Sequence, residues 1–439
     1  MSSIIKVDTI QDQAGNNIIN ENSNTITIGK TNDTINIVGT LQNNGSAIPG
    51  DISSVVAGTG LSGGGTSGDV TLNVEAAQSG VTSLGTLTGL TVNGNVSIDG
   101  GTIKLDGNYP TGTENVALGN TALDSGSLSG AYNTAIGSAS MTANTSGERN
   151  VAVGRTSLEA NLGGSFNVAS GYGALRLNTS GGSNTAIGYN AMLANQTGEG
   201  NTAVGEGALD ANNPGDDNVA IGKLSLSGNT TADNNTAVGT CALKTNTTGT
   251  ENVAVGLCAL TANTTASNNV AVGRKALATN TTGTHNVALG FNSQFSTTEG
   301  LCNISVGGGS LQSNTTGCYN IGIGRFANCA NTTSNNNVAV GHESLKVNTA
   351  ANNTAVGYNA LTANTSGTEN TAVGLCSLVS NQTGNSNVSV GQNSLCANTA
   401  SNNTAVGTVS LCANTSGANN TAVGRSSLRA NTTASNNTA

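Results

Sequence analysis

Apolar and polar residues alternate along most of this chain in a pattern that repeats about every seventeen positions. The repeating stretch reads N-V-A-L-G at residues 115–119 and is still present as N-T-A-V-G at residues 420–424. Nineteen intervals separate its anchor asparagines, of which sixteen are 17 residues long, two are 16 and one is 18. Such regularity indicates a repeat protein whose units bury their apolar faces against each other.

Positions counted from each anchor asparagine keep a fixed character. Position 1 is Val, Thr or Ile, position 2 is Ala, Ser or Gly, position 3 is aliphatic except at Ser170, and position 4 is Gly. Positions 1 and 3 share one side of a β-strand, and β-branched residues favour strands. We therefore expect Val and Ile to fill the interior, Ala to allow close packing on the opposite face, and Gly to make a sharp bend. Representative anchor and bend pairs are Asn150 with Gly154, Asn201 with Gly205, and Asn252 with Gly256.

The second half of each unit is equally regular. Position 7 is Ala or Ser, position 8 is Leu in fifteen units and Met in two, and position 11 is a second Asn in seventeen units. This pattern predicts a second strand followed by an Asn-Thr turn. Coils stacked about 4.8 Å apart would form a rod on the order of 90 Å long. We expect an all-β, elongated parallel β-roll or β-solenoid of 17-residue coils, since no 3.6-residue period supports a helix.

Two segments that differ from the array in composition and residue pattern precede it. Residues 1–50 contain runs at 25–28 and 34–38 with the period-2 alternation of strands, and they end at Pro49-Gly50. Residues 51–110 carry a glycine-rich run, which we interpret as turns between the short strands of a shaft. A phosphate-binding P-loop is excluded because no Lys-Ser/Thr follows the glycines. We therefore divide the chain into a β-rich leader (1–50), a Gly-rich β shaft (51–110) and the repeat array (111–439).

The small residues of the array predict self-association. A slender roll has little core of its own, and lateral pairing of several chains would bury the Ala and Ser columns. We expect a homotrimer.

Composition narrows the function classes. Only 8% of residues are charged, against about 25% in ordinary globular domains. The net charge is −9 without basic clusters, which argues against nucleic-acid binding. The chain contains no apolar run of about 18 residues, so no membrane-spanning segment is predicted. No signal peptide is evident at the N-terminus, and we therefore expect synthesis in a cytoplasm. The eight cysteines form no C-x-x-C pair; we interpret them as small apolar side chains, with stacked disulfides as the alternative.

Residues that could carry chemistry are sparse. His285 and His342 are the two histidines, and they lie more than three repeats apart. We expect no enzymatic activity, no metal site and no cofactor. A candidate partner patch lies where Gln294 and Asn328 interrupt the leucine column. Four of the ten aromatic residues gather there, namely Phe291, Phe295, Tyr319 and Phe326; local repacking of the core is the alternative.

Several stretches resemble known families. The motif N-x-A-[VI]-G followed by Ala/Ser-Leu resembles the repeats of trimeric autotransporter adhesin heads, which are trimeric left-handed parallel β-rolls with somewhat shorter coils. The longer unit A-L-x-A-N-T-T-G-x-x-N-T-A-V-G resembles repeats of phage tail fibres. The leader, I-K-V-D-T-I-Q-D-Q-A-G-N-N at residues 5–17, is similar to the start of tail fibres of marine phages, especially cyanophages. Residues 56–65, V-A-G-T-G-L-S-G-G-G, resemble phage fibre shafts.

The resemblance implies a structural tail fibre of a bacteriophage virion. Its N-terminus, with Ile5, Val7 and Ile10, would dock on tail proteins (an adaptor, nozzle or baseplate protein), and a distal tip would contact a host cell-surface receptor. Because the array stops at residues 437–439, two residues short of a complete anchor motif, we expect a longer fibre with a C-terminal tip. The alternative is an adhesin whose β-roll itself binds a host glycan or surface protein. A third possible function is ice binding by a ladder of Thr side chains. It is disfavoured because Thr alternates irregularly with Val at position 1 of the repeat.

Overall fold

The structure, a computed structural model, describes residues 113–439 throughout and, before them, the backbone of six short strands between Thr9 and Val74. The chain forms two compact units, Met1–Thr102 and Ile103–Ala439. Across the described residues the secondary structure is entirely β, without any helix. The all-β prediction is therefore confirmed for this part of the chain.

The first unit contains two small antiparallel sheets. One has the order β1-β2-β3 and the other β4-β5-β6. The predicted strand at 25–28 is confirmed as β3, whereas the one at 34–38 lies outside the described residues. The glycine-rich run, which we interpreted as turns between short strands, also takes part in a strand, since Gly64 and Gly65 pair with Val56 and Val55. The strands are β1 (Thr9–Gln11), β2 (Asn17–Asn22), β3 (Thr25–Ile28), β4 (Val55–Val56), β5 (Leu61–Gly65) and β6 (Leu72–Val74).

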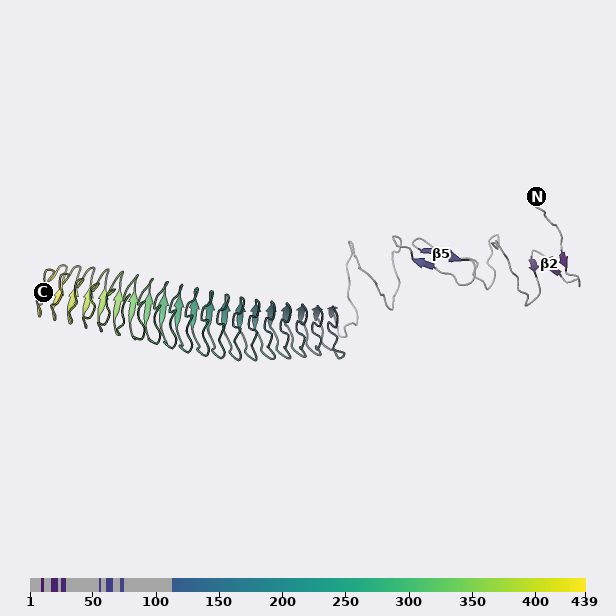
Figure 1. The fold of residues 1–439 in the computed structure, drawn as a ribbon, viewed down its shortest axis with the longest axis horizontal. Coiled ribbons are helices and arrows are strands. Elements are labelled where there is room, and N and C mark those ends of the chain that lie inside the picture. Colours follow the sequence, from purple (N-terminus) through teal and green to yellow (C-terminus); the bar gives the residue numbers. More distant parts are fainter. Residues whose placement is uncertain are drawn as a thin grey trace, which may run out of the picture. The chain divides into compact units, whose positions relative to one another are not determined.

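The second unit is a parallel β-solenoid with one three-residue strand per coil (Figure 1). Each strand pairs in register with the strands of the coils before and after it, so that position 1 pairs with position 1 along the array. Pairing runs from β7 to β25 in chain order, and no pairing recorded for residues 113–439 joins β25 back to β7, so the stack is open. The strands are β7 (Val116–Leu118), β8 (Thr134–Ile136), β9 (Val151–Val153), β10 (Val168–Ser170), β11 (Thr185–Ile187), β12 (Thr202–Val204), β13 (Val219–Ile221), β14 (Thr236–Val238), β15 (Val253–Val255), β16 (Val270–Val272), β17 (Val287–Leu289), β18 (Ile304–Val306), β19 (Ile321–Ile323), β20 (Val338–Val340), β21 (Thr354–Val356), β22 (Thr371–Val373), β23 (Val388–Val390), β24 (Thr404–Val406) and β25 (Thr421–Val423).

The predicted second strand of each coil is absent from the described residues. Positions 6 and 8 adopt the left-handed backbone conformation, as in Cys241 with φ 57° and Leu243 with φ 50°. Two such residues within three positions prevent an extended strand, so the chain turns repeatedly instead. The backbone groups of these turns are still satisfied along the axis; for example, the N–H of Leu243 donates to the carbonyl of Ala259, one coil further on, at 3.0 Å.

The core lies on the side of the strand opposite to the one predicted. Position 2 is fully buried in nearly every coil, and Ala254, for example, is 0% exposed. Its neighbours Val253 and Val255 are only half-buried. Position 2 faces positions 7 and 8 across the coil, since an added Cβ on Gly322 would lie 2.5 Å from Ser310 Oγ and 3.2 Å from Leu311 Cγ. Only a small side chain fits there, which explains Ala and corrects the prediction that Val and Ile fill the interior.

Two columns of asparagine are buried beside this apolar core. Anchor asparagines such as Asn252 and position-11 asparagines such as Asn263 are 0% exposed. Most position-11 amides donate from Nδ2 to Oδ1 of the asparagine one coil earlier, as Asn263 does to Asn246 at 2.8 Å. Asn263 also donates to a carbonyl of its own turn, that of Ala266, at 2.9 Å. Burial is tolerated because these amides are paired within and between coils.

The glycine at position 4 makes the predicted bend. Its φ lies between 124° and 137° in every coil, a region that L side chains rarely adopt. The structure adds a second reason for glycine, since an added Cβ on Gly256 would lie 2.6 Å from the carbonyl oxygen of Gly273 in the next coil. The glycine column therefore sets both the bend and the close approach of successive coils.

The apolar core is interrupted once. One buried cluster extends to Ala288 and another begins at Ala327. Around this interruption, Gln294 and Asn328 occupy the leucine column and are 0% exposed. Gln294 Nε2 donates to the carbonyl of Val287 at 2.9 Å, but neither side-chain polar atom of Asn328 has a partner. The sequence break is thus a weak point in the core.

Candidate functional site

The most extensive candidate site is the outward face of the parallel sheet. Positions 1 and 3 are exposed or half-exposed in every strand from β7 to β25, while position 2 is buried in all but the first. Exposed large apolar side chains on this face include Ile187 at 43% and Ile221 at 40%. The face is therefore a continuous strip of Val, Ile, Leu and Thr along the array. Monomeric proteins rarely expose apolar patches of this length.

Sequence reasoning missed this face because it assigned these columns to the interior. The Ala and Ser columns that were expected to pair chains laterally are instead buried within each coil, as Ala254 and Ala259 show. An alternating pattern marks two faces of a strand but not which one is covered. The signal that could have corrected the assignment was Leu at position 8, which needs a small partner across a narrow coil.

A column of aromatic and charged side chains at position 5 borders the strip. The rings of Tyr172 and Tyr189 stack with centroids 5.5 Å apart and an interplanar angle of 13°, and the Arg155 guanidinium lies 5.6 Å from the Tyr172 centroid. In the following coils, Lys223 Nζ contacts Glu206 Oε2 at 2.9 Å. The facing surfaces of the rings are occupied by neighbouring coils. Tyr172 and Tyr189 are nevertheless 41% and 56% exposed, so both rings remain open to solvent.

The predicted aromatic patch is divided among separate contacts. Phe291 follows strand β17, is 51% exposed and lies 5.4 Å from the Arg274 guanidinium. Tyr319 precedes strand β19 and is 59% exposed. Phe295 faces Lys275 Nζ at 5.8 Å, and Phe326 faces the Arg325 guanidinium at 4.6 Å. No ring-to-ring contact among these four is recorded in the described array. The structure thus places two of the rings at opposite borders of the strand face, and their role as a partner patch stays a prediction.

Phe326 has a local packing role. A Cβ added to Gly309, one coil earlier, would lie 2.6 Å from Phe326 Cδ1, so the ring covers that glycine. The alternative of local repacking thus has direct support for Phe326.

Of the predicted attachment residues, Ile5 and Val7 lie outside the described residues. Ile10 lies in β1 and pairs with Ile19 of β2. The repeat anchors Asn150, Asn201 and Asn252 are buried, and their partners Gly154, Gly205 and Gly256 are the bends described above. These anchors build the coil and present no side chain to a ligand.

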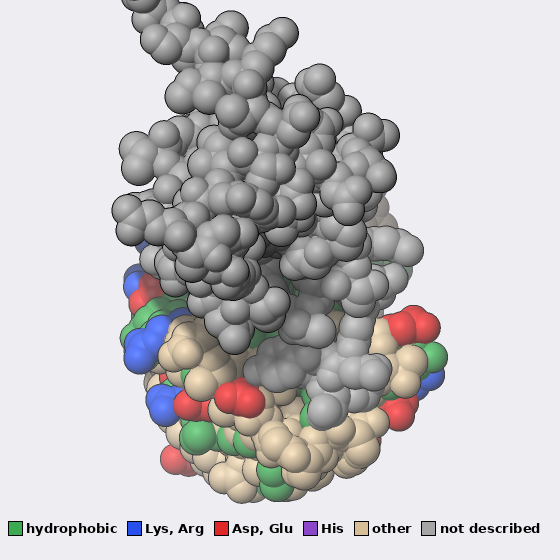
Figure 2. All heavy atoms as spheres, turned by 90° about the vertical axis from the view of Figure 1, so that its right-hand side faces the viewer, with side chains coloured by type: hydrophobic (Ala, Val, Ile, Leu, Met, Phe, Trp, Pro, Cys, Tyr) green, Lys and Arg blue, Asp and Glu red, His purple; other side chains and the backbone are tan. Residues whose placement is uncertain are grey.

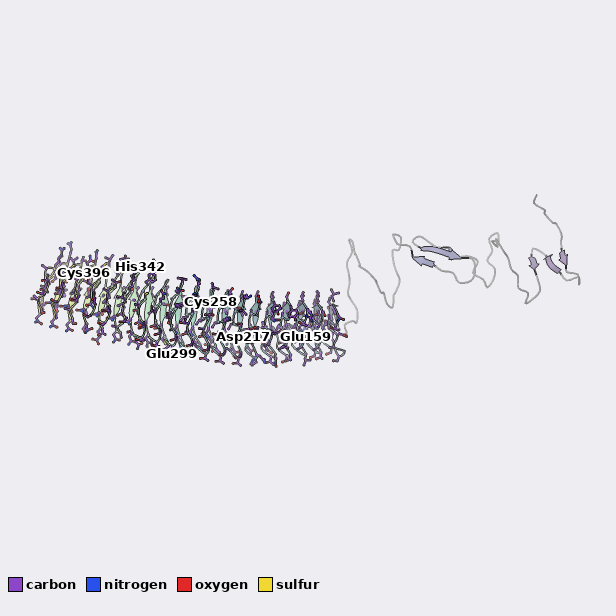
Figure 3. All side chains as sticks on the ribbon, in the orientation of Figure 1. Glu159, Asp217, Cys258, Glu299, His342 and Cys396 are labelled. Carbon is purple, nitrogen blue, oxygen red and sulfur yellow. The ribbon has the colours of Figure 1, made fainter. Side chains whose placement is uncertain are left out.

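Chemically reactive side chains are dispersed along the array (Figure 3). Glu159, Asp217, Cys258 and His342 lie in separate coils. The His342 ring stacks on Tyr358 with centroids 5.5 Å apart. Within the part of the chain that the structure describes, no three His, Cys, Asp or Glu side chains come close enough to hold a metal ion.

The array carries charges of both signs, and its acidic residues include a column over three adjacent coils, in which the Glu199 N–H donates to Asp216 Oδ1 and the Asp216 N–H donates to Asp233 Oδ1, both at 2.7 Å. The end-on view of Figure 2 shows basic and acidic side chains interspersed around the visible part of the array. No helix in the described residues is long and apolar enough to cross a membrane. Comparison with protein-family models, curated proteins and solved structures found no match to this chain.

Proposed function

We propose that this chain is a structural tail fibre of a bacteriophage virion. Its N-terminal segment docks on a tail adaptor, nozzle or baseplate protein, and its solenoid holds a receptor-binding tip toward the host cell surface. The observation that carries the structural role is the continuous bonding of each coil to the next. The virion assignment is supported by the resemblance of residues 5–17 to the start of marine phage tail fibres and of residues 56–65 to phage fibre shafts.

A rod of this kind resists bending and stretching because three kinds of ladder run along its axis. Strands pair in register, turn amides donate to the next coil, and buried asparagines bridge coils, as between Asn246 and Asn263. Separating two coils would break all of these bonds together and expose the leucine column. A stiff spacer is the mechanical requirement for presenting a tip at a distance.

We also propose that three copies associate through the exposed strand face. A strip three residues wide and nineteen strands long measures about 10 Å by about 90 Å, so it offers on the order of 900 Å² per chain. That area is close to the roughly 800 Å² per partner of a standard stable interface. Cyclic symmetry about an axis parallel to the rod lets every copy bury the same strip. The number three follows the resemblance to trimeric adhesin heads.

Two measurements test this proposal. Light scattering should give a molar mass of three times the 43.0 kDa of one chain, and a monomer mass would contradict the trimer. Deleting residues 1–50 should leave a soluble rod that no longer joins virus particles. If the shortened fibre still assembled onto particles, the docking role of the leader would be wrong.

The second candidate function is an adhesin whose solenoid binds a host glycan or surface protein. It is favoured by the exposed rings Tyr189 and Tyr358 beside the strand face, which are 56% and 51% exposed. Binding of the full chain to host cells should then fall when these two tyrosines are replaced by serine. Unchanged binding by that variant would favour the spacer role.

A further inference from the structure

The cysteines of the array fall mostly into two columns. Position 6 holds Cys241, Cys258 and Cys376, and position 9 holds Cys329, Cys396 and Cys412. Each column therefore contains one pair in adjacent coils. All eight cysteines are free thiols and are half-buried.

The position-9 pair differs from the position-6 pair in its sulfur contact. The Sγ atoms of Cys396 and Cys412 lie 2.7 Å apart, much closer than two unbonded thiols normally rest. Cys396 Sγ also lies 3.2 Å from the Cys412 carbonyl oxygen. Elsewhere in residues 113–439 no two cysteine sulfurs are in contact, and this includes Cys241 and Cys258.

The backbone explains why one column brings its sulfurs together. Position 6 is in the left-handed region in both Cys241 and Cys258, at φ 57° and φ 55°, whereas Cys396 and Cys412 have ordinary negative φ. Adjacent coils lie about 4.8 Å apart, within the Cα separation of roughly 4.4–6.8 Å that a disulfide requires. Closing the remaining gap to the bonded length of about 2.05 Å needs only a small side-chain movement.

We propose that Cys396 and Cys412 form an intrachain disulfide that links two neighbouring coils covalently. The oxidant is a low-molecular-weight disulfide such as oxidised glutathione. One cysteine thiolate attacks this disulfide and forms a mixed disulfide, releasing one glutathione thiolate. The second cysteine then attacks the protein sulfur of the mixed disulfide and releases the other glutathione. The net change is two protein thiols plus one glutathione disulfide giving one protein disulfide and two glutathione thiols.

The setting of the pair controls how fast such a link can form. Burial, together with the hydrogen bond and charge of Cys412, raises the pKa of the Cys396 thiol to about 12. Protonation of this thiol slows exchange at neutral pH, and raising the pH speeds exchange by increasing the thiolate fraction. The disulfide would prevent two coils from separating when the rod is pulled, a property useful to the fibre proposed above. The chemistry of the pair does not depend on that function.

The test equilibrates the full-length folded protein in mixtures of reduced and oxidised glutathione. Remaining thiols are then blocked with N-ethylmaleimide, and peptides are identified by mass spectrometry after digestion with pepsin in acid. Trypsin would not serve, because no Lys or Arg lies between Lys346 and Arg425 and all three nearby cysteines would stay in one peptide. We expect the Cys396–Cys412 peptide to form at a ratio of oxidised to reduced glutathione at least about tenfold lower than any Cys241–Cys258 peptide.

The pair Cys241 and Cys258 is a control within the same molecule, so no variant needs to fold for the test to succeed. The proposal is overturned if both pairs oxidise at the same ratio, or if Cys396 is recovered linked to Cys376 or capped by glutathione. As a further check, Cys376→Ser should leave the link intact, while Cys412→Ser should abolish it.

Discussion

The backbone N–H of Asn269 donates to Oδ1 of Asn252, one coil earlier, at 3.0 Å, and both asparagines are 0% exposed. The same bond joins successive anchor asparagines along the array, for example Asn286 to Asn269 at 3.0 Å. The side-chain oxygen of each of these anchor asparagines therefore accepts a hydrogen bond from a buried backbone N–H that has no backbone carbonyl as its partner. This relationship explains why Asn recurs at a position where Ala would otherwise suit a narrow core.

Replacing Asn252 by Ala should destabilise the array. The N–H of Asn269 would lose its acceptor in a buried site, which costs about 1–3 kcal/mol. Chemical denaturation followed by circular dichroism should show a correspondingly lower midpoint. The control is Thr265→Ala, an exposed turn residue of the same coil, which should leave the midpoint nearly unchanged. Equal effects of the two substitutions would contradict a structural role for the buried ladder.

Two adjacent glycines provide a matched pair for the bend. Gly307 has φ 125°, and an added Cβ would lie 2.7 Å from the backbone of Gly324. Gly308 has no positive φ, and its added Cβ would find its nearest neighbour 3.9 Å away. Gly307→Ala should therefore destabilise the array by about 2 kcal/mol or more. Gly308→Ala should be neutral or stabilise slightly, by about 0.4–1 kcal/mol. Thermal unfolding of both variants tests this contrast, and a similar loss in each would refute it.

The interruption of the core should be repairable. Asn328 occupies the leucine column with both side-chain polar atoms buried and unpartnered. Asn328→Leu removes that penalty and extends the buried leucine column from Leu345 to Leu311, so it should stabilise by about 1–3 kcal/mol. The reverse change one coil later, Leu345→Asn, should destabilise by about 2–5 kcal/mol. Calorimetry of both variants provides the measurement, and a lower melting temperature for Asn328→Leu would show that the amide is needed.

A β-branched residue in the left-handed region offers a simpler test of backbone strain. Val409 has φ 52°, and the same position one coil earlier is Asn393, also at φ 52°. Because Asn tolerates this conformation better than Val, Val409→Asn should stabilise by about 1 kcal/mol. Asn393→Val should have the opposite effect. Denaturant midpoints that moved in the same direction for both variants would argue against the strain.

Charges placed on the strand face should separate the proposed trimer without unfolding the coils. Val238 and Val255 lie at position 3 of adjacent coils, and both are half-exposed. Replacing both by Lys would put like charges on the strip that we propose to be buried between chains. Light scattering should then report a smaller assembly with unchanged circular dichroism. Thr265→Lys, at an exposed turn, is the control; if the double variant kept the mass of the unmodified protein, the interface would lie elsewhere.

Several features of this protein followed from local sequence alone. The anchor spacing predicted coils of seventeen residues, and β-branched residues at positions 1 and 3 predicted the strand found in each coil. The invariant glycine predicted a bend, since φ near 130° is a property of single residues. The fixed leucine at position 8 was visible in the sequence, and the structure buries it in nearly every coil, as at Leu260. Each of these conclusions depends on backbone preference or on a strict period, which a sequence displays directly.

Only the tertiary structure decided which face of each strand is buried and how the coil closes. The alternation of large and small residues marks two faces of a strand, but it does not show that Val253 and Val255 lie outside while Ala254 lies inside. The choice depends on the space inside the coil, which is set by the path of positions 5 to 16. Left-handed residues such as Leu260, with φ 49°, bring the opposite wall close enough that only a small side chain such as Ala fits against Leu. That distance arises from residues far from the strand in the repeat, and no local pattern shows it.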